Sequence, residues 1–313
     1  MLLDGIGVLA SLLILTIAGD QFVIALARLA ARFGIRPTVI ATIVGGLGTS
    51  VPQLLVSGLA ARRGEPQIAI GSLVGSIIAA ACLALALAAL LVPIEVDSKA
   101  IRREVPLSVA AVLSFGLLAL GGLSHFEAKI LMVLALPAIG ILVVSARPAE
   151  TGELEREVQD FYQRKVAHRA GAESGRAFMG VGLMIAGADL LVASASGAET
   201  RLGMSQSFIG LSVVAIGTSA PLIAASIQAA RRGDHDLVVG SVLGQSLFLA
   251  LVGGALVGLV SHTPSVALNP TALWFMMGAF VTAGMFMARQ RRVTRAEAGV
   301  LLLAYILLLA IVR

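Results

Sequence analysis

Cysteine and charge are both scarce in this sequence. Cys82 is the only cysteine in 313 residues, which excludes an internal disulfide framework and a thiolate cluster for a metal. Charged residues make up 13% of the chain and hydrophobic residues 58%, against roughly 25% and 45–50% in soluble domains. So much apolar surface is not expected to fold in water, and a membrane protein is the natural interpretation.

The motifs of common enzyme classes are missing as well. The sequence has no Walker loop, nucleophile elbow or dinucleotide fingerprint, so we expect neither an enzyme nor a resident cofactor. The net charge of +5 comes from short basic stretches without interleaved aromatic residues, which argues against nucleic acid as a partner. The four histidines fall in expected loops and form no HxxxH or HxH pair, so they do not predict a zinc site.

Apolar runs of about twenty residues recur along the chain, each long enough to cross about 30 Å of hydrocarbon as a helix. The first run has no basic leader and no convincing cleavage site, so we expect it to be retained and not removed as a signal peptide. The sequence predicts an all-α polytopic membrane protein with ten transmembrane helices. These spans are expected at residues 3–29, 37–61, 67–92, 106–123, 128–146, 177–200, 205–230, 236–260, 270–288 and 296–312.

Basic residues are distributed unevenly between the two sets of loops. When the loops are assigned alternately to the two sides, one side receives 18 of the 23 Lys and Arg. The positive-inside rule makes this the cytoplasmic side, so we expect both termini outside the cytoplasm of a bacterial or archaeal inner membrane. The opposite side keeps only Arg62, Arg63, Lys129, Arg201 and Arg313.

The chain repeats itself at an offset of 169 residues without insertion. The segment GTSVP at Gly48–Pro52 matches GTSAP at Gly217–Pro221, and two AARRG blocks match at Ala60–Gly64 and Ala229–Gly233. In the same register Asp20 matches Asp189, and Gly71, Ser72 and Gly75 match Gly240, Ser241 and Gly244. Chance does not supply two five-residue blocks at one offset, so the chain contains an internal repeat.

An odd number of spans in each half makes the two copies inverted. We expect a first five-helix repeat over residues 1–147, a cytoplasmic linker over 148–176 and a second, inverted five-helix repeat over 177–313. The linker mixes acidic and basic residues and predicts one amphipathic helix. Inverted repeats are typical of transporters that work by alternating access around a site near the bilayer midplane.

The two proline motifs are the expected place of that site. Proline removes an amide donor and disfavours helical geometry at the preceding residue, so we expect interrupted helices with carbonyls and hydroxyls exposed beside the break. The alternative is that the prolines only kink their helices and that the hydroxyls bond to their own preceding turns. The symmetric placement of two copies favours the site over the kink.

These motifs resemble the alpha repeats of the sodium/calcium exchanger family in the cation/calcium exchanger superfamily. The family pattern is roughly GTSxPE followed by GNxxGSNxxN, and this chain reads GTSVPQ with GSLVGSIIAA, then GTSAPL with GSVLGQSLFL. The resemblance implies a ten-helix antiporter. It also implies glutamates after the two prolines, but Gln53 and Leu222 stand there, and Ala80 and Leu249 replace their polar partners.

Loss of the acidic ligands leaves an uncharged centre. Calcium takes six to eight oxygens with help from carboxylates, so we expect no calcium at the central site. A monovalent cation such as sodium, held by dipoles, or a small organic solute would suit the oxygen donors that are left. The candidate ligands are Thr49, Ser50, Gln53, Ser76, Thr218, Ser219 and Gln245, with Ser246 as a further candidate.

Two acids, Asp20 and Asp189, lie within the first span of each half. An intramembrane carboxylate is a candidate for a proton or cation relay. The competing interpretation, which we favour, places each acid near an interface or in a bond to a neighbouring helix. Glu65, Asp234 and Asp236 adjoin the AARRG blocks, where a solvated turn with local charge pairing is the simpler interpretation.

The sequence therefore favours a secondary transporter that exchanges a cation for another solute. A membrane scaffold or sensor that keeps the exchanger fold without transport is the main alternative, and a monovalent-ion channel is a weaker one. Flux measurements separate the three, because a carrier shows saturable counterflow and a channel shows ohmic conductance.

Overall fold

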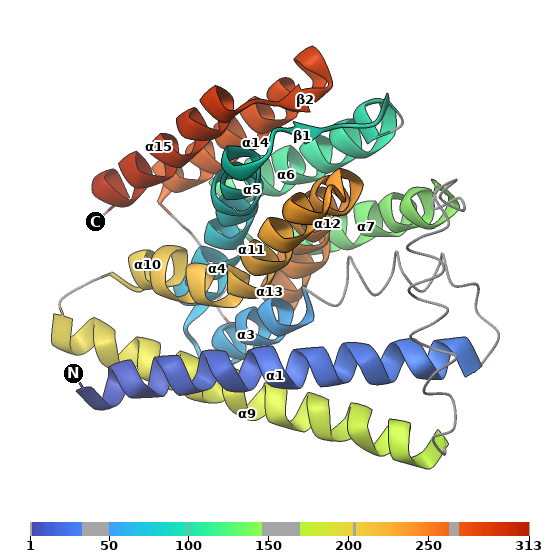
Figure 1. The fold of residues 1–313 in the computed structure, drawn as a ribbon. Coiled ribbons are helices and arrows are strands. Elements are labelled where there is room, and N and C mark those ends of the chain that lie inside the picture. The colour runs from blue at the N-terminus through green and yellow to red at the C-terminus, as the bar shows by residue number, and fades with distance from the viewer. Residues whose placement is uncertain are drawn as a thin grey trace.

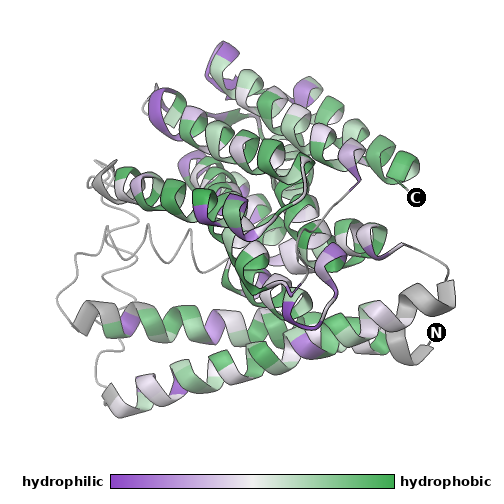
Figure 2. Cartoon of the chain, turned by 180° about the vertical axis from the view of Figure 1, so that it is seen from behind, coloured by the Kyte–Doolittle hydropathy of each residue, from purple (hydrophilic) through white to green (hydrophobic). Residues whose placement is uncertain are grey.

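The computed structural model describes residues 2–32, 50–98, 100–145, 170–202, 205–262 and 269–312, and these are almost entirely helical (Figure 1). Candidate ligand Thr49, the first part of the second expected span and most of the expected linker helix lie outside the described residues. Eight described helical segments have the length and apolar composition to cross a membrane. Hydropathy is high along the helices and falls at many of their ends (Figure 2).

The helices of the first half follow the expected spans. They are α1 (Leu2–Arg32), α3 (Val51–Arg62), α4 (Pro66–Ala79), α5 (Ala86–Leu91), α6 (Val105–Leu120) and α7 (His125–Ser145). A π-helical segment, Ala80–Leu85, joins α4 to α5, and another, Ala100–Glu104, leads into α6. A helix that widens locally from α to π geometry is often found near functional sites.

The second half repeats this order. Its helices are α9 (Ala170–Leu202), α10 (Gln206–Ile209), α11 (Ala215–Arg232), α12 (His235–Phe248), α13 (Gly254–Val260), α14 (Pro270–Gln290) and α15 (Arg295–Val312). The π-helical segments Gly210–Val214 and Leu249–Gly253 join α10 to α11 and α12 to α13. The segments beginning at Ala80 and Leu249 are 169 residues apart, so the repeat extends to this local distortion.

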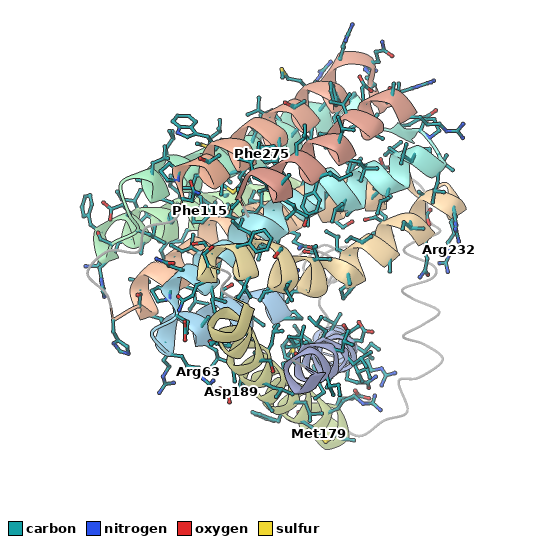
Figure 3. The ribbon with its side chains drawn as sticks, turned by 90° about the vertical axis from the view of Figure 1, so that its left-hand side faces the viewer. Arg63, Phe115, Met179, Asp189, Arg232 and Phe275 are labelled. Carbon is teal, nitrogen blue, oxygen red and sulfur yellow. The ribbon has the colours of Figure 1, made fainter. Side chains whose placement is uncertain are left out.

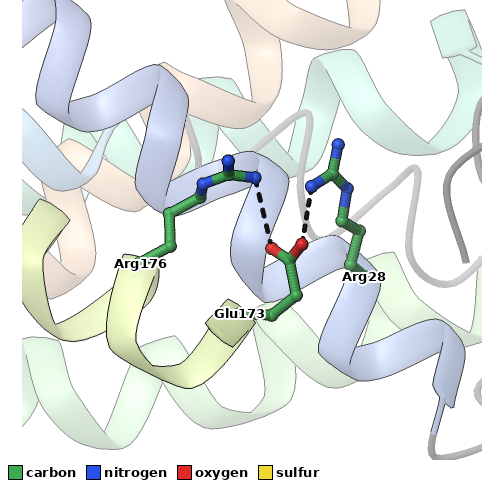
Figure 4. A network of polar contacts seen from close by, with 3 residues as sticks. All are labelled: Arg28, Glu173 and Arg176. Atoms are coloured by element: carbon green, nitrogen blue, oxygen red, sulfur yellow. Dashed lines mark hydrogen bonds and ion pairs between the residues drawn. The ribbon is translucent and has the colours of Figure 1, made fainter. Parts of the chain in front are cut away.

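Helix α9 begins earlier than expected, at Ala170 instead of near residue 177. The polar residues of its first turns explain the difference. Glu173 is buried and forms ion pairs with Arg28 of α1 at 2.7 Å and with Arg176 one turn along at 3.5 Å (Figure 4). These pairs let the helix continue through residues too polar to count as part of an apolar span.

Helices α1 and α9 pack along each other and lie across one face of the other helices (Figure 1). Close approach requires small residues in the contact, because a side-chain carbon at Gly187 of α9 would lie 3.0 Å from Ile14. The pair covers the proline motifs, since a side chain at Gly19 of α1 would lie 3.1 Å from Pro52. The most buried spans, α4–α5 and α12–α13, lie in the interior behind this pair.

Three loops meet on one side of the bundle. Strand β1 (Ile94–Glu95) pairs antiparallel with β2 (Arg292–Val293), which joins the loop after α5 to the loop before α15. The backbone amide of Glu95 also donates to Nδ1 of His235 at the start of α12, at 3.2 Å. The alternating assignment of loops predicted that these three connections share a side, and their contacts agree with it.

The last helix of each half begins with the same kind of cap. In α7 the Glu127 carboxylate accepts from the Ser124 backbone amide at 2.9 Å, and in α15 the Glu297 carboxylate accepts from the Thr294 amide at 2.8 Å. Both are capping boxes, which supply partners to amides that a helix start leaves unpaired.

Candidate ion-binding site

The two proline motifs meet through the side chain of Gln53. This residue is 2% exposed on α3, and its amide Nε2 donates to the backbone carbonyl of Thr218 on α11 at 2.9 Å. The bond fixes the orientation of the amide, because the reverse orientation would place two oxygens against each other. Gln53 therefore presents its other atom, the acceptor Oε1, which has no hydrogen-bond partner among the described residues.

Ser76 joins the same cluster from α4. Its hydroxyl lies 3.5 Å from the hydroxyl of Thr218, and both residues are buried. The Thr218 hydroxyl also donates to the Val214 carbonyl of its own helix at 2.8 Å. The structure thus brings Gln53, Ser76 and Thr218 together, as the repeat predicted. The Thr218 hydroxyl itself is engaged with its preceding turn, as the alternative interpretation expected.

The expected helix interruption is wrong for the second motif. Helix α11 runs through Pro221 without a break, and it follows the π-helical segment Gly210–Val214. Pro221 lacks the amide that would bond one turn back, and membrane helices tolerate this where neighbouring groups satisfy the backbone. The carbonyl that loses its helical donor at Pro221 is that of Gly217, so the donation from Gln53 to the next carbonyl, that of Thr218, is an additional bond in the same turn. In the first motif Pro52 stands in the first turn of α3, where a missing amide is tolerated.

Several polar atoms in this region are buried without partners. Ser219 and Gln245 are both fully buried, and neither the Ser219 hydroxyl nor either atom of the Gln245 amide has a hydrogen-bond partner within the described ranges. Such groups cost free energy unless something bonds to them, so each unpaired one calls for an explanation. Ser50 occupies the N-cap position of α3, where its side chain forms no capping hydrogen bond, and is also buried. Ser246, in contrast, donates to the Val242 carbonyl of its own helix at 2.7 Å.

Apolar side chains occupy the positions where the family pattern has acids or their partners. Leu222 is 1% exposed, and Ala80 and Leu249 are fully buried at the starts of the two mirrored π-helical segments. The described part of the chain contains no group of three or more His, Cys, Asp or Glu that could hold a metal ion. The described members of the cluster, Gln53, Ser76 and Thr218, carry no formal charge.

The two mirrored aspartates differ in their surroundings. Asp189 on α9 forms an ion pair with Arg63, which follows α3 in the first AARRG block (Figure 3). Asp20 on α1 is exposed and forms no ion pair with any described residue, and the mirrored Arg232 lies far from Asp189 and Arg63 in Figure 3. The interpretation that we favoured allowed each acid to lie near an interface or to bond to a neighbouring helix, and a bond to a neighbouring helix is seen for Asp189 and not for Asp20 among the described residues.

A second polar contact lies beside the Arg63–Asp189 ion pair, between α9 and the turn from α3 to α4. The Ser196 hydroxyl, two helical turns beyond Asp189, donates to the Glu65 carboxylate at 3.1 Å. The matching position on α1 is Ala27, which has no hydroxyl to offer the mirrored Asp234. Helix α9 is thus held to the turn between α3 and α4 by two polar contacts. The corresponding contacts between α1 and the turn after α11 are absent from the described residues.

Two further polar contacts between helices were not predicted from the sequence. The Ser57 and Ser72 hydroxyls lie 2.8 Å apart and join α3 to α4, and the Arg28–Glu173 pair joins α1 to α9. The matched serines were visible in the repeat, but nothing in the sequence showed that they bond to each other. In the second half the pair does not form, because Ser226 has no partner among the described residues and Ser241 bonds to its own helix.

Comparison with known proteins identifies the relatives of this arrangement. The sodium/calcium exchanger protein family model matches residues 5–145 and 175–313. The chain belongs to the sodium/calcium exchanger family. CaxA of Alkalimonas amylolytica is 29% identical over 98% of this chain and 97% of its own length. Inner membrane protein YrbG of Escherichia coli (strain K12) is 32% identical over 79% of this chain and 77% of its own length.

The fold has a solved counterpart. A structure of the sodium-calcium exchanger NCX_Mj, soaked with sodium and strontium, matches 100% of both chains with a TM-score of 0.69 and 25% identity. The family resemblance and the ten-helix inverted-repeat fold predicted from the sequence are confirmed. This member of the exchanger family is a multi-pass membrane protein and a secondary transporter of inorganic cations, of the cation-antiporter type, and not an enzyme.

Proposed function

We propose that this exchanger binds a monovalent cation, sodium in the first instance, at an uncharged central site and does not bind calcium there. The observation that carries the proposal is the fixed amide of Gln53. Its donor is occupied by the Thr218 carbonyl, so the residue offers one neutral acceptor where the family pattern has a carboxylate. A monovalent ion can be held by dipoles of this kind.

A divalent cation has a much greater desolvation cost to offset. Calcium sites combine several oxygens, commonly including carboxylates, and none of the ligand positions around Gln53 carries one. Burial of an uncompensated dication among Leu222, Ala80 and Leu249 is therefore unfavourable. The same neutral centre could hold a small polar solute, because the Gln245 amide offers a donor as well as an acceptor.

Alternating access would use the α1–α9 pair as the moving element. The pair covers both proline motifs, and its two helices are joined by the Arg28–Glu173 ion pair. On one side α9 is attached through Arg63 and Glu65, and the described residues of the other side lack the matching contacts. We propose that this state is closed beside the turn between α3 and α4 and that the polar contacts there break when it opens.

The topology proposal follows from the basic loops. The contacts among the connections at residues 92–95, 233–235 and 291–293 place these loops together, and the excess of Lys and Arg supports a cytoplasmic position for them. We propose that both termini lie outside the cytoplasm and that residues 148–176 link the repeat 1–147 to the repeat 177–313 on the inside. Of the two aspartates, the unpaired Asp20 is the better candidate for a relay.

A scaffold or sensor without transport is the second candidate. The observation that favours it is the apolar replacement of three mirrored polar positions, together with hydroxyls at Thr218 and Ser246 that bond to their own helices. In that case the polar cluster would be a packing layer between α3 and α11.

Flux in proteoliposomes tests the two proposals against each other. Protein reconstituted with internal sodium should catalyse saturable sodium counterflow, which Gln53→Ala abolishes and Ser246→Ala preserves. Ser246→Ala is a matched control because its hydroxyl is bonded within its own helix. Absence of counterflow with every inorganic cation tested would refute transport and favour the scaffold. Sodium counterflow that Gln53→Ala leaves unchanged would refute the site.

A further inference from the structure

A groove of about 780 Å³ lies between α6 and α7, away from the central site. Its walls are apolar. They are formed by Pro106, Leu107 and Ala110 on α6 and by Pro137, Gly140 and Ile141 on α7. Proline at position 137 lies inside α7, and Gly140 has no side chain to fill the space beside it. The prolines, the alanine and the glycine of this lining have small side chains or none, and they leave the space between α6 and α7 unfilled.

One end of the groove is charged. Arg103 lines it just before α6 begins at Val105, and this arginine is exposed and forms no ion pair with a described residue. The acidic neighbour Glu104 is partly buried and lies near Asp97 and Asp236, and no acidic residue of the described ranges lines the groove. A guanidinium without an ion-pair partner among the described residues therefore lies at one end of the apolar groove.

The groove opens near one membrane surface. Arg103 precedes α6, and Ile141 is four residues from the end of α7 at Ser145, so the two antiparallel helices place both residues near the same surface. From Arg103 to Ala110 the chain advances roughly 10 Å at 1.5 Å per residue. Ile141 is 47% exposed beside the groove, so the channel is open to the hydrocarbon.

We propose that this groove binds one anionic phospholipid, with its phosphodiester at Arg103 and an acyl chain between α6 and α7. Arginine presents several donors in a planar fork that matches a phosphate group. Basic pockets between transmembrane helices are known to hold anionic lipid headgroups. A water-soluble anion would gain nothing from the apolar walls, and a zwitterionic lipid would carry an ammonium group toward the guanidinium.

The chain offers matched controls for both parts of the proposal. Arg102 is an exposed arginine at the same surface, but it does not line the groove. At Gly140 an added Cβ meets no described atom within 4 Å, so the backbone there has room for Gly140→Leu, whose side chain would occupy part of the groove that Gly140 lines. Gly278 on α14 has equally open surroundings and lies elsewhere, so Gly278→Leu tests for a general effect of an added leucine.

Native mass spectrometry of the detergent-solubilised protein, titrated with phosphatidylglycerol or phosphatidylcholine, tests the proposal. The wild type should retain one phosphatidylglycerol in preference to phosphatidylcholine. Arg103→Gln should weaken phosphatidylglycerol binding about tenfold, as expected for loss of a charge-assisted contact, and Arg102→Gln should not. Gly140→Leu should lower occupancy by both lipids, whereas Gly278→Leu should leave it unchanged.

The proposal would be overturned by equal retention of the two lipids in the wild type, by equal effects of Arg102→Gln and Arg103→Gln, or by full occupancy in Gly140→Leu. Inorganic phosphate that competes with phosphatidylglycerol at comparable concentration would also overturn it, because the acyl chain would then contribute nothing. The arginine variants change only a surface side chain, so they decide the question even if the leucine variant fails to fold.

Discussion

The side-chain amide of Gln53 donates a 2.9 Å hydrogen bond to the backbone carbonyl of Thr218 and so joins the two inverted repeats at their proline motifs. The bond uses a carbonyl beside Pro221, in the turn where proline has removed one helical donor. It also fixes which atom of the Gln53 amide faces Thr218, so that Nε2 is the donor in this bond and Oε1 faces away from that carbonyl. Gln53 thus joins α3 to α11 through its amide nitrogen, and its Oε1, which has no partner among the described residues, is the atom that we propose as a ligand.

Substitution of Gln53 by alanine should affect both roles. The free energy of unfolding should fall by about 1–3 kcal/mol, because a buried bond is lost and the Thr218 carbonyl loses a donor. The rise in melting temperature with sodium should disappear, since only a ligand that binds the folded state produces it. Thermal unfolding with and without sodium measures both effects, and a sodium-dependent rise equal to that of the wild type would exclude Gln53 as a ligand.

Substitution of Gln53 by glutamate should introduce sensitivity to calcium. A carboxylate cannot donate to the Thr218 carbonyl, so the ion-free protein should be destabilised by about 2–4 kcal/mol. Calcium should then raise the melting temperature of Gln53→Glu and leave that of the wild type unchanged. A larger calcium effect in the wild type than in the variant would contradict a neutral site.

The Arg28–Glu173 pair should contribute strongly to the packing of α1 against α9. Its side chains are 11% and 7% exposed, so Glu173→Gln removes the negative charge from a largely buried ion pair and should cost about 3 kcal/mol. Arg176 is 39% exposed and lies 3.5 Å from the same carboxylate, so Arg176→Gln should cost less than about 1 kcal/mol. Chemical denaturation in detergent ranks the two variants, and a reversed order would show that the pair is unimportant.

Gly75 should tolerate no larger residue, because α4 packs there directly on the second half. An added side-chain carbon would collide with the backbone carbonyl of Leu211 and with Ala215. We expect Gly75→Ala to lower the free energy of unfolding by about 1–3 kcal/mol, the usual cost of overpacking. Gly299→Ala on α15, whose surroundings are open, is the control and should be close to neutral. Equal stability of the two variants would refute this contact.

The mirrored aspartates provide a test of the moving element. Asp189→Asn removes the ion pair with Arg63 and should increase the accessibility of the end of α3 to a membrane-impermeant thiol reagent in an Ala61→Cys background, because Ala61 is fully buried in this state. Asp20→Asn removes an unpaired acid and should leave labelling unchanged. The only native cysteine, Cys82, is buried and so gives little background. Equal labelling in both variants would show that the pair does not hold α9 to the turn.

Asp20→Asn also addresses the proposed relay. If Asp20 carries protons, proton-coupled cation flux into proteoliposomes should fall in Asp20→Asn and persist in Asp189→Asn. Unchanged flux in both variants would remove the relay from the account.

The sequence was sufficient for the large-scale architecture because hydrophobic length and repetition encode it. The offset of 169 residues located both proline motifs and the mirrored positions Ala80 and Leu249, where the π-helical segments begin. The pairing of Gln53 with Thr218 across the repeats was only implied, since register along the chain does not say which side-chain atom meets which carbonyl. Proximity of the motifs was predictable, but their hydrogen bonds were not.

The failures have local causes. Pro221 was expected to break its helix, but α11 runs through it and follows directly on a π-helical segment. Helix α9 extends beyond its apolar span because Glu173 finds Arg28 on another helix, a contact 145 residues away that composition does not reveal. The asymmetry between Asp20 and Asp189 arises from their tertiary partners, although the two residues match in sequence.

Isothermal titration calorimetry of the wild type and Gln53→Ala with sodium and with calcium tests the uncharged site most directly. The account predicts saturable sodium binding that Gln53→Ala abolishes, and no calcium binding in the micromolar range. Micromolar calcium affinity that is lost in Gln53→Ala would contradict it, because a divalent ion would then be bound at the neutral centre.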